Sequence, residues 1–221
     1  MTMAGQTSGG DIRPGLVTAG REIEQESFRI IDAEMGSHTF RADQWAVVRR
    51  IIHTTGDFEF ARQVRFHPRA IAAGVEALQK GAAIITDTRM IQVGLSTWRL
   101  EWFGNEVLTP MTDPETQVLA KELGTTRSVA AFRHHRQRLQ GAVVAIGNAP
   151  TALLEVLRLI AEDGVRPALV VGVPVGFVQA VEAKEALWQR QDQPSITCLG
   201  RKGGSPVALA IVHALLELAR A

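Results

Sequence analysis

The stretch that decides the fold is VVAIGNAPTALLEVL at residues 143–157. Its apolar run at residues 143–146 has the composition of a buried parallel strand, and the Gly-Asn-Ala-Pro segment that follows ends the run. Apolar residues then recur at helical spacing from Thr151, and Pro150 suits the first turn of a helix. The stretch therefore predicts a buried strand, a tight loop and a helix.

Two later stretches repeat this arrangement. ALVVGVPVGF at residues 168–177 and SITCLGRKGGSP at residues 195–206 are apolar runs that end in glycine-rich loops. Earlier strands are expected at residues 82–86 and 106–111, whereas residues 58–66 are ambiguous between strand and helix. Alternating strands and helices predict an α/β fold, a Rossmann-like parallel sheet of about five strands with helices on both faces, preceded by N-terminal helices. In such sheets the loops at the carboxyl ends of the strands build the ligand site.

Length and composition limit the possible functions. We expect a flexible tail at residues 1–20, which are rich in Gly, Ser and Thr, and a single α/β domain at residues 21–221. A net charge of +1 without a basic tract gives no case for nucleic acid, and uncharged runs are shorter than the roughly 18 residues that cross a membrane. Cys198 is the only cysteine, which excludes an intrachain disulfide and favours a cytoplasmic location.

The common ligand motifs are missing from the sequence. There is no P-loop, no G-x-G-x-x-G after a strand, and no histidine spacing typical of a zinc site. The glycine loop at residues 172–176 has no serine for a nucleophile elbow. What remains is a site without an obvious metal or covalent nucleophile.

The glycine loops instead offer backbone N–H groups at helix starts, which are good partners for carboxylates and phosphates. Arg201 and Lys202 add charge to one loop, although both can equally be solvated. Arg127 lies at an expected helix start, where a cation is unfavourable unless an anion lies beside it. His53 lies at an expected helix end, where a histidine can also merely cap carbonyls. These residues suit a polyanionic small molecule.

Several stretches, in one order, resemble the precorrin-8X methylmutase family, which includes the cobalt-precorrin-8 methylmutases. The resembling segments are I-x-x-x-S-F-R-I-I at residues 23–31, RRIIHTTGD at residues 49–57 and GAAIITDTRMIQVG at residues 81–94. Thr126-Arg127-Ser128 and the three glycine loops complete the resemblance. It covers the chain from about residue 23 to the C-terminus.

The family catalyses an isomerisation, in which a methyl group moves from carbon 11 to carbon 12 of a corrin precursor. The resemblance implies that His53 is the catalytic acid, and an imidazole suits proton donation to a ring nitrogen near neutral pH. It implies a tetrapyrrole substrate with many carboxylates, metal-free or cobalt-loaded, and no cofactor. The substrate contacts that it implies are Ser27, Arg127, Ser128, Asn148, Arg201, Gly203 and Gly204.

Two other functions remain possible at this point. A non-catalytic carrier that sequesters the corrin product would keep its affinity when His53 is replaced by alanine, whereas an isomerase would lose turnover. A nucleotide-binding enzyme is disfavoured by the missing phosphate motifs. The resemblance also implies a homodimer, and Trp98, Trp102 and Phe103 support it because a short exposed loop rarely carries three aromatic residues. The alternative is that these side chains fold back onto their own core.

Overall fold

The structure is a computed structural model that describes residues 14–221, with side chains from residue 20 onward. The chain divides after His38 into two compact units. The first contains helix α1 (Pro14–Met35), although the apolar pattern of the sequence predicts a helix only from about residue 19. The expected tail at residues 1–20 lies largely outside the described residues, and α1 begins within it.

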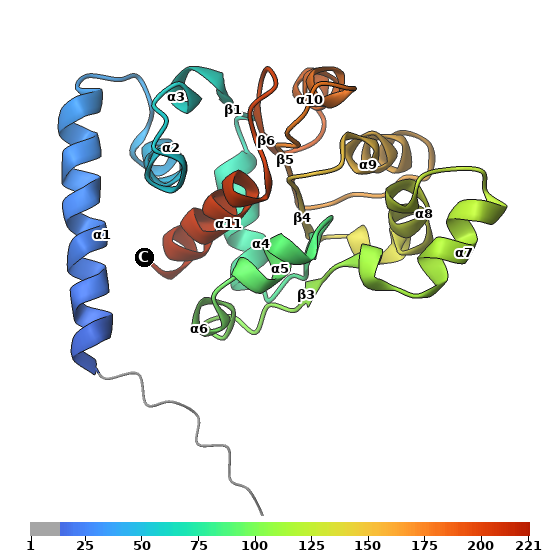
Figure 1. The fold of residues 1–221 in the computed structure, drawn as a ribbon, viewed down its shortest axis with the longest axis horizontal. Coiled ribbons are helices and arrows are strands. Elements are labelled where there is room, and N and C mark those ends of the chain that lie inside the picture. The colour runs from blue at the N-terminus through green and yellow to red at the C-terminus, as the bar shows by residue number, and fades with distance from the viewer. Residues whose placement is uncertain (1–13) are drawn as a thin grey trace, which may run out of the picture. The chain divides into compact units, whose positions relative to one another are not determined.

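The second unit contains one six-stranded sheet, with strand order β1-β6-β5-β4-β2-β3 (Figure 1). Its strands are β1 (Val64–Phe66), β2 (Ile84–Thr86), β3 (Val107–Leu108), β4 (Val143–Ile146), β5 (Leu169–Gly172) and β6 (Ser195–Cys198). The strands β2 to β6 pair in parallel, and each corresponds to an expected strand. The additional strand, β1, lies in the ambiguous stretch and pairs antiparallel with β6, with Val64 opposite Cys198.

Helices cover both faces of this sheet, as the alternation of strands and helices predicts. The α-helices are α2 (Ala42–Thr55), α3 (Phe60–Gln63), α4 (Ala70–Gln79), α5 (Arg89–Gly94), α6 (Thr97–Leu100), α7 (Glu115–Glu122), α8 (Arg127–His134), α9 (Pro150–Glu162), α10 (Ala180–Gln189) and α11 (Ser205–Arg220), and the short 3-10 helices are η1 (Pro110–Thr112) and η2 (Arg136–Leu139). In Figure 1, α4, α5 and α11 lie on one face, and α8, α9 and α10 lie on the other. Helix α2 packs against α11.

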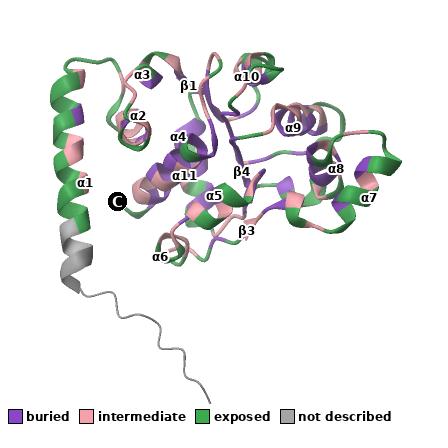
Figure 2. Cartoon of the chain, in the orientation of Figure 1, coloured by how far each residue is buried: buried purple, intermediate pink, exposed green. Residues whose placement is uncertain are grey.

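The core follows from this layering. Strands β4, β5 and β6 are buried along their whole length, because helices exclude water from both faces (Figure 2). Helix α9 buries an apolar stripe that includes Leu153, Val156 and Ile160 against the sheet. Cys198 is fully buried in β6, as a small core residue would be, and burial raises the pKa of its thiol to about 12. Among residues 14–221, no helix combines the length and the apolar character needed to cross a bilayer.

The sequence predicts a helix from Asp43 to about Thr54 with Asp43 as its N-cap, and helix α2 differs from this at its start. Asp43 is not the N-cap; Arg41 occupies that position, and Asp43 lies inside the first turn. The Asp43 carboxylate accepts a hydrogen bond from the backbone N–H of Gln44 at 2.8 Å and pairs with the guanidinium of Arg41 at 2.8 Å. An acid in the first turn stabilises a helix without capping it, which is why the sequence pattern pointed to the wrong residue.

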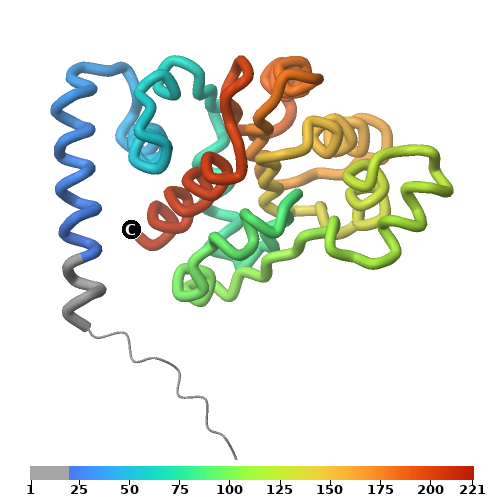
Figure 3. Tube along the Cα trace, in the orientation of Figure 1, coloured from blue at the N-terminus to red at the C-terminus, as the bar shows by residue number. Residues whose placement is uncertain are grey.

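The sheet topology determines where a ligand site can form. From β4 the chain continues through β5 and β6 toward one edge, whereas β2 and β3 lie toward the other edge. The strand order therefore reverses between β2 and β4, and in open α/β sheets ligands commonly bind at the carboxyl ends of the strands beside such a reversal. Figure 3 traces the loops after β4, β5 and β6 at this end of the sheet.

Candidate active site

A buried carboxylate lies where the strand order reverses. Asp87 directly follows β2 and is 3% exposed. Its two oxygens accept hydrogen bonds from the backbone N–H groups of Gly147, Asn148 and Ala149, at 3.0, 2.8 and 2.7 Å. Burial raises the pKa of the Asp87 carboxyl, and the three N–H donors oppose that rise. Asp87 therefore fixes the loop after β4, at whose surface Asn148 is exposed.

This arrangement corrects one expectation. The sequence predicts that the N–H groups of the loop after β4 bind substrate carboxylates, but the carboxylate that they bind is Asp87. Other loop N–H groups are also used within the protein. Gly176 donates to the Arg201 carbonyl at 3.2 Å, and Gly204 donates to the Val173 carbonyl at 2.8 Å. Charged side chains, rather than these N–H groups, are left to recognise an anion.

The loop after β6 contacts its neighbours at distances that only glycine permits. A Cβ added at Gly203 would lie 2.2 Å from the Val173 carbonyl oxygen, and the φ of Gly203 is +156°. A Cβ at Gly147 would lie 2.7 Å from the Cα of Ser205. Glycine at these positions allows the loops after β4, β5 and β6 to pack directly on one another. Asn148, Gly203 and the start of α11 are thus brought to one edge of the sheet.

The loop between β5 and α10 exposes apolar side chains beside this edge. Phe177 is 83% exposed and Val178 is 79% exposed. The guanidinium of Arg201 lies 5.1 Å from the centre of the Phe177 ring, within the range of a cation–π contact. Gln179, which follows Val178, has a left-handed φ of 60°, which is unusual for a residue other than glycine. The sequence reasoning included Arg201 but missed Phe177, although an aromatic residue directly after a glycine loop could have indicated it.

The start of α8 is joined to the start of α9. Ser128 is 5% exposed, and its Oγ lies 2.7 Å from the Oγ1 of Thr151 in the first turn of α9. Arg127 is exposed and donates a hydrogen bond to the Met111 carbonyl at 3.2 Å. The contact between Ser128 and Thr151 brings Arg127 and the loop of Asn148 to the same end of the sheet.

His53 is exposed in the last turn of α2. Gly56 ends the helix with a φ of 65° and donates its N–H to the Ile52 carbonyl at 2.7 Å. Asp57, the next residue, forms an ion pair with Lys202, as does Glu59 at 2.7 Å. The hydrogen bond with Lys202 lowers the pKa of the Asp57 carboxyl.

Lys202 therefore ties the chain just beyond His53 to the loop after β6. The two functions that the sequence allowed for this lysine were solvation and anion binding. It is instead paired with acids of the same chain.

Ser27 lies in the first unit, on α1, and its side chain is half-buried. Its Oγ donates a hydrogen bond to the carbonyl of Ile23, one helical turn earlier, at 2.8 Å. Such a bond is common for serine within a helix. The contact between Ser27 and the substrate stays a prediction from family resemblance.

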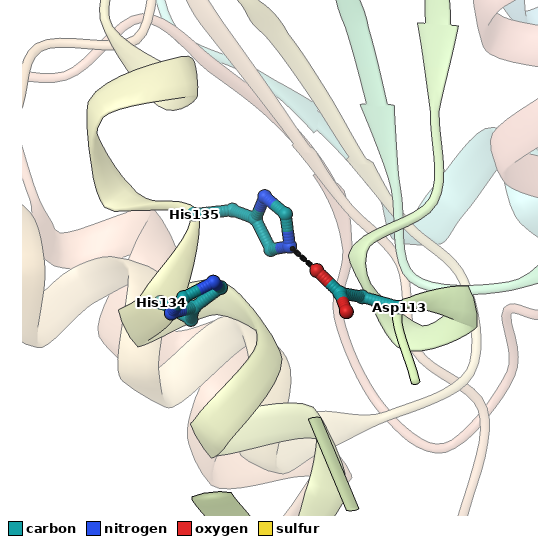
Figure 4. Close-up of side chains that lie close together, drawn as sticks. All are labelled: Asp113, His134 and His135. Carbon is teal, nitrogen blue, oxygen red and sulfur yellow. Dashed lines mark hydrogen bonds and ion pairs between the residues drawn. The ribbon is translucent and has the colours of Figure 1, made fainter. Parts of the chain in front are cut away.

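One group of side chains in the described residues has ligands near enough for a metal ion, and Figure 4 shows it. In this group Asp113, His134 and His135 place their ligand atoms within 4.8 Å of one another. His135 lies 2.9 Å from one oxygen of Asp113, and the other oxygen accepts the backbone N–H of Glu115 at 2.9 Å. These two contacts lower the pKa of the Asp113 carboxyl, chiefly the one from Glu115. Sequence spacing did not indicate the group because Asp113 and His135 are 22 residues apart.

Comparisons with known proteins identify the family. The model of the family described as "Precorrin-8X methylmutase" matches residues 22–218. The cobalt-precorrin-8 methylmutase of Leptospira interrogans is 44% identical over 210 residues, which are 92% of this chain and 96% of that protein. The precorrin-8X methylmutase of Pseudomonas aeruginosa is 42% identical over 197 residues, covering 89% of this chain and 94% of that one.

A solved structure agrees with these sequence matches. The crystal structure of the precorrin-8x methyl mutase from Thermus thermophilus superimposes with a TM-score of 0.84 at 49% identity. It covers 90% of this chain and 96% of its own. The resemblance drawn from the motifs is thereby confirmed, since the match runs almost from end to end. The chain belongs to the precorrin-8X methylmutase family.

Proposed function

We propose that this protein moves a methyl group from carbon 11 to carbon 12 of precorrin-8X or cobalt-precorrin-8, with His53 as the acid. Membership of the family makes it an isomerase of cobalamin biosynthesis. The observation that carries the proposed site is the pairing of Lys202 with Asp57, because it joins the end of the His53 helix to the glycine loops. None of the relatives described above is named as a carrier, so the alternative gains no support from them.

The reaction requires few groups from the protein. One carbon–carbon bond breaks at carbon 11 and one forms at carbon 12, so no atom or electron enters or leaves overall. A proton or hydrogen bond given by His53 to a ring nitrogen draws electron density through the conjugated system and lowers the barrier to migration. The same proton returns to His53 when the product forms. General acid catalysis of this kind contributes roughly 10²- to 10⁴-fold.

The proposed recognition of the substrate combines charge with an apolar surface. Because the N–H groups described above are engaged within the protein, we assign the substrate carboxylates chiefly to the side chains of Arg127 and Arg201. The exposed Phe177 and Val178 offer an apolar surface to the conjugated macrocycle. The remaining contacts that we propose, on family resemblance, are Ser27, Ser128, Asn148, Gly203 and Gly204.

We extend the proposal to the organisation of the protein. Residues 21–221 act as one methylmutase domain built on a Rossmann-like sheet, and the family match over residues 22–218 supports that span. The protein acts in the cytoplasm as a homodimer. Exposed apolar side chains on α5 and α6 support the dimer, namely Met90 at 62%, Val93 at 73% and Trp98 at 42% exposure. Trp102 is only half-buried and stacks edge-to-face on Trp98 at 4.9 Å, so these aromatic residues do not form a closed core of their own.

The experiment compares His53→Ala and His53→Asn with His134→Ala, a change at another exposed histidine that lies at the far end of α8. Each purified variant is incubated with precorrin-8X, and with its cobalt form, and product formation is followed by absorbance. We expect a fall in kcat of roughly 10²-fold or more for both His53 variants, with product affinity within threefold of wild type. Wild-type turnover by His53→Ala would remove His53 from the mechanism. A wild-type protein that binds product and never turns over substrate would support the carrier.

A further inference from the structure

A fully buried lysine lies beneath the loop after β6. Lys184, on α10, is 0% exposed, and its Nζ donates a hydrogen bond to the backbone carbonyl of Lys202 at 2.8 Å. In the part of the chain that the structure describes, Lys184 forms no ion pair with a carboxylate. Burial lowers the pKa of Lys184 to about 8, which shows that the fold bears a cost to keep this ammonium inside. This carbonyl belongs to Lys202, and the side chain of Lys202 reaches acids just beyond the end of the His53 helix.

The side chain of Lys202 pairs with two acids that follow α2 in the sequence. Lys202 Nζ pairs with Asp57 and, at 2.7 Å, with Glu59; we call this set the Lys202 bridge. The three side chains are between 32% and 52% exposed. Exposed ion pairs of this kind contribute little to folding stability. A contribution to folding stability therefore does not account for the Lys202 bridge. Its position, between the residues after α2 and the loop after β6, suggests a role in holding these two segments together.

Both ends of the bridge are held by further contacts within the protein. Asp57 lies four residues after His53, and one of its oxygens accepts the backbone N–H of Glu59 at 2.9 Å, so the acidic turn is internally fixed. On the other side, Gly203 packs against the Val173 carbonyl more closely than any side chain would allow. The Lys202 bridge therefore sets the distance between the end of α2 and the loop after β6.

We infer that Lys202 is a positioning residue for methyl migration: it holds the His53 end of α2 at a fixed distance from the substrate-binding loop after β6, and Lys184 anchors Lys202 from below. This inference rests on the proposed role of His53. Lys202 touches neither the substrate nor the reacting atoms. Its effect reaches the reaction through Asp57 and Glu59, because misplacing a catalytic group by about 1 Å can cost roughly a hundredfold in rate.

The test is a double-mutant cycle. One arm is Lys202→Met, which keeps the length of the side chain and removes its charge. The other arm is Asp57→Asn with Glu59→Gln, which keeps the charge on Lys202 and removes its partners. We expect kcat to fall about tenfold in each arm and in the combined variant, with product Kd within threefold of wild type. Lys202→Arg should recover most of kcat, because arginine can still reach a carboxylate.

The matched control is Lys80→Met, which removes an exposed ion pair with Glu76, 2.6 Å long, away from the site. Its kcat should equal that of wild type. The outcome that overturns the inference is a weaker product Kd for Lys202→Met together with unchanged or tighter binding for the acidic arm. That pattern would mean that Lys202 contacts substrate carboxylates and that Asp57 and Glu59 compete for it. Unchanged kcat in both arms would also overturn it.

Failure of this inference is distinct from failure of the proposed function. If His53→Ala lacks turnover and the bridge variants retain it, the catalytic role of His53 stands and the bridge has no positioning role. If His53→Ala turns over normally, the proposed mechanism fails whatever the bridge variants do. Should Lys202→Met fail to fold, the acidic arm carries the test alone, because it changes only partly exposed side chains.

Discussion

The carboxylate of Asp87 accepts a 2.8 Å hydrogen bond from the backbone N–H of Asn148, and this bond joins the end of β2 to the loop after β4. Two strands that lie side by side at the reversal of strand order are thereby held at a fixed separation. An acid that directly follows a buried strand is positioned by the sheet itself, so its carboxylate needs little freedom to reach the facing loop. The first prediction tests how much the fold depends on it.

Asp87→Asn should lower the free energy of unfolding by about 1.5–3 kcal/mol, because one acceptor oxygen becomes an NH₂ group that faces backbone donors. Urea denaturation measures the change. Asp192→Asn is the control, since Asp192 is exposed and, among the residues that the structure describes, pairs only with nearby Arg190. Equal stability of Asp87→Asn and wild type would mean that the loop after β4 is held by other contacts.

Gly203→Ala should distort the loop after β6, because its Cβ would meet the Val173 carbonyl oxygen at 2.2 Å. We expect a loss of stability of about 1–3 kcal/mol and product binding weakened by about tenfold or more. Gly164→Ala separates strain from collision, because Gly164 has a left-handed φ of +71° with nothing within 4 Å of an added Cβ. Isothermal titration with product compares the two, and equal affinities would show that the close approach at Gly203 has no role in binding.

Arg127→Ala should weaken product binding by roughly one to two powers of ten, as the loss of one charge-assisted bond to a carboxylate would. Stability should change little, since Arg127 is exposed and bonds only a carbonyl within the described residues. Arg136→Ala, at another exposed arginine that bonds a carbonyl, is the control. Titration at low salt gives both affinities, and an affinity equal to wild type would make Arg127 purely structural.

Lys184→Met should change how stability depends on pH. The pKa of Lys184 is about 8 in the folded protein and near 10.5 when unfolded, so between these values the unfolded chain binds more protons. Raising the pH from 8 to 10.5 therefore stabilises wild type relative to Lys184→Met, and below pH 8 the buried charge costs the wild type its full penalty. Denaturation at pH 7, 9 and 10.5 measures the difference. A difference that is constant with pH would mean that the pKa of Lys184 is the same in the folded and the unfolded protein.

Trp98→Glu should shift the protein from dimer to monomer. A twofold dimer uses the same surface on both subunits, so the new charge would occur on both sides of the interface. Trp98 is a better position than Trp102, since the Trp98 side chain is 42% exposed whereas Trp102 is half-buried, although an arginine lies over each ring. Val118→Glu is the control, at an apolar residue on α7 that is 57% exposed. Light scattering gives the mass directly, and a monomeric wild type at micromolar concentration would end the dimer proposal.

The fold could be predicted from the sequence to the extent that each element has a local pattern. The buried run at residues 143–146 is uniformly apolar because both faces of the sheet are covered, and Pro150 marks the start of α9. Strand β1 has no such pattern. Its three residues become a strand because β6, more than a hundred residues later, offers an unpaired edge. Pairing of that kind depends on tertiary contacts and leaves little trace in three residues.

The candidate site could be predicted where residues of unusual type follow a strand or begin a helix. Arg201, Gly203 and Asn148 satisfy that condition and lie at one edge of the sheet. The partners of the loops could not be predicted. Asp87 occupies N–H groups that the sequence left for substrate, and Lys202 binds acids more than 140 residues away in the chain. Such pairings come from the topology of the sheet, and no spacing within one segment reports them.

The pairing of β1 with β6 and the packing of α2 on α11 determine when, during synthesis, these early elements of the protein can fold. The ribosome makes the helix that carries His53 more than a hundred residues before β6 and α11, which supply the surfaces that β1 and this helix require. Until those elements have left the exit tunnel, the edge strand has no partner and the histidine helix has no support. The His53 helix therefore cannot take its place before β6 and α11 have been made, and until then its apolar face is open to aggregation.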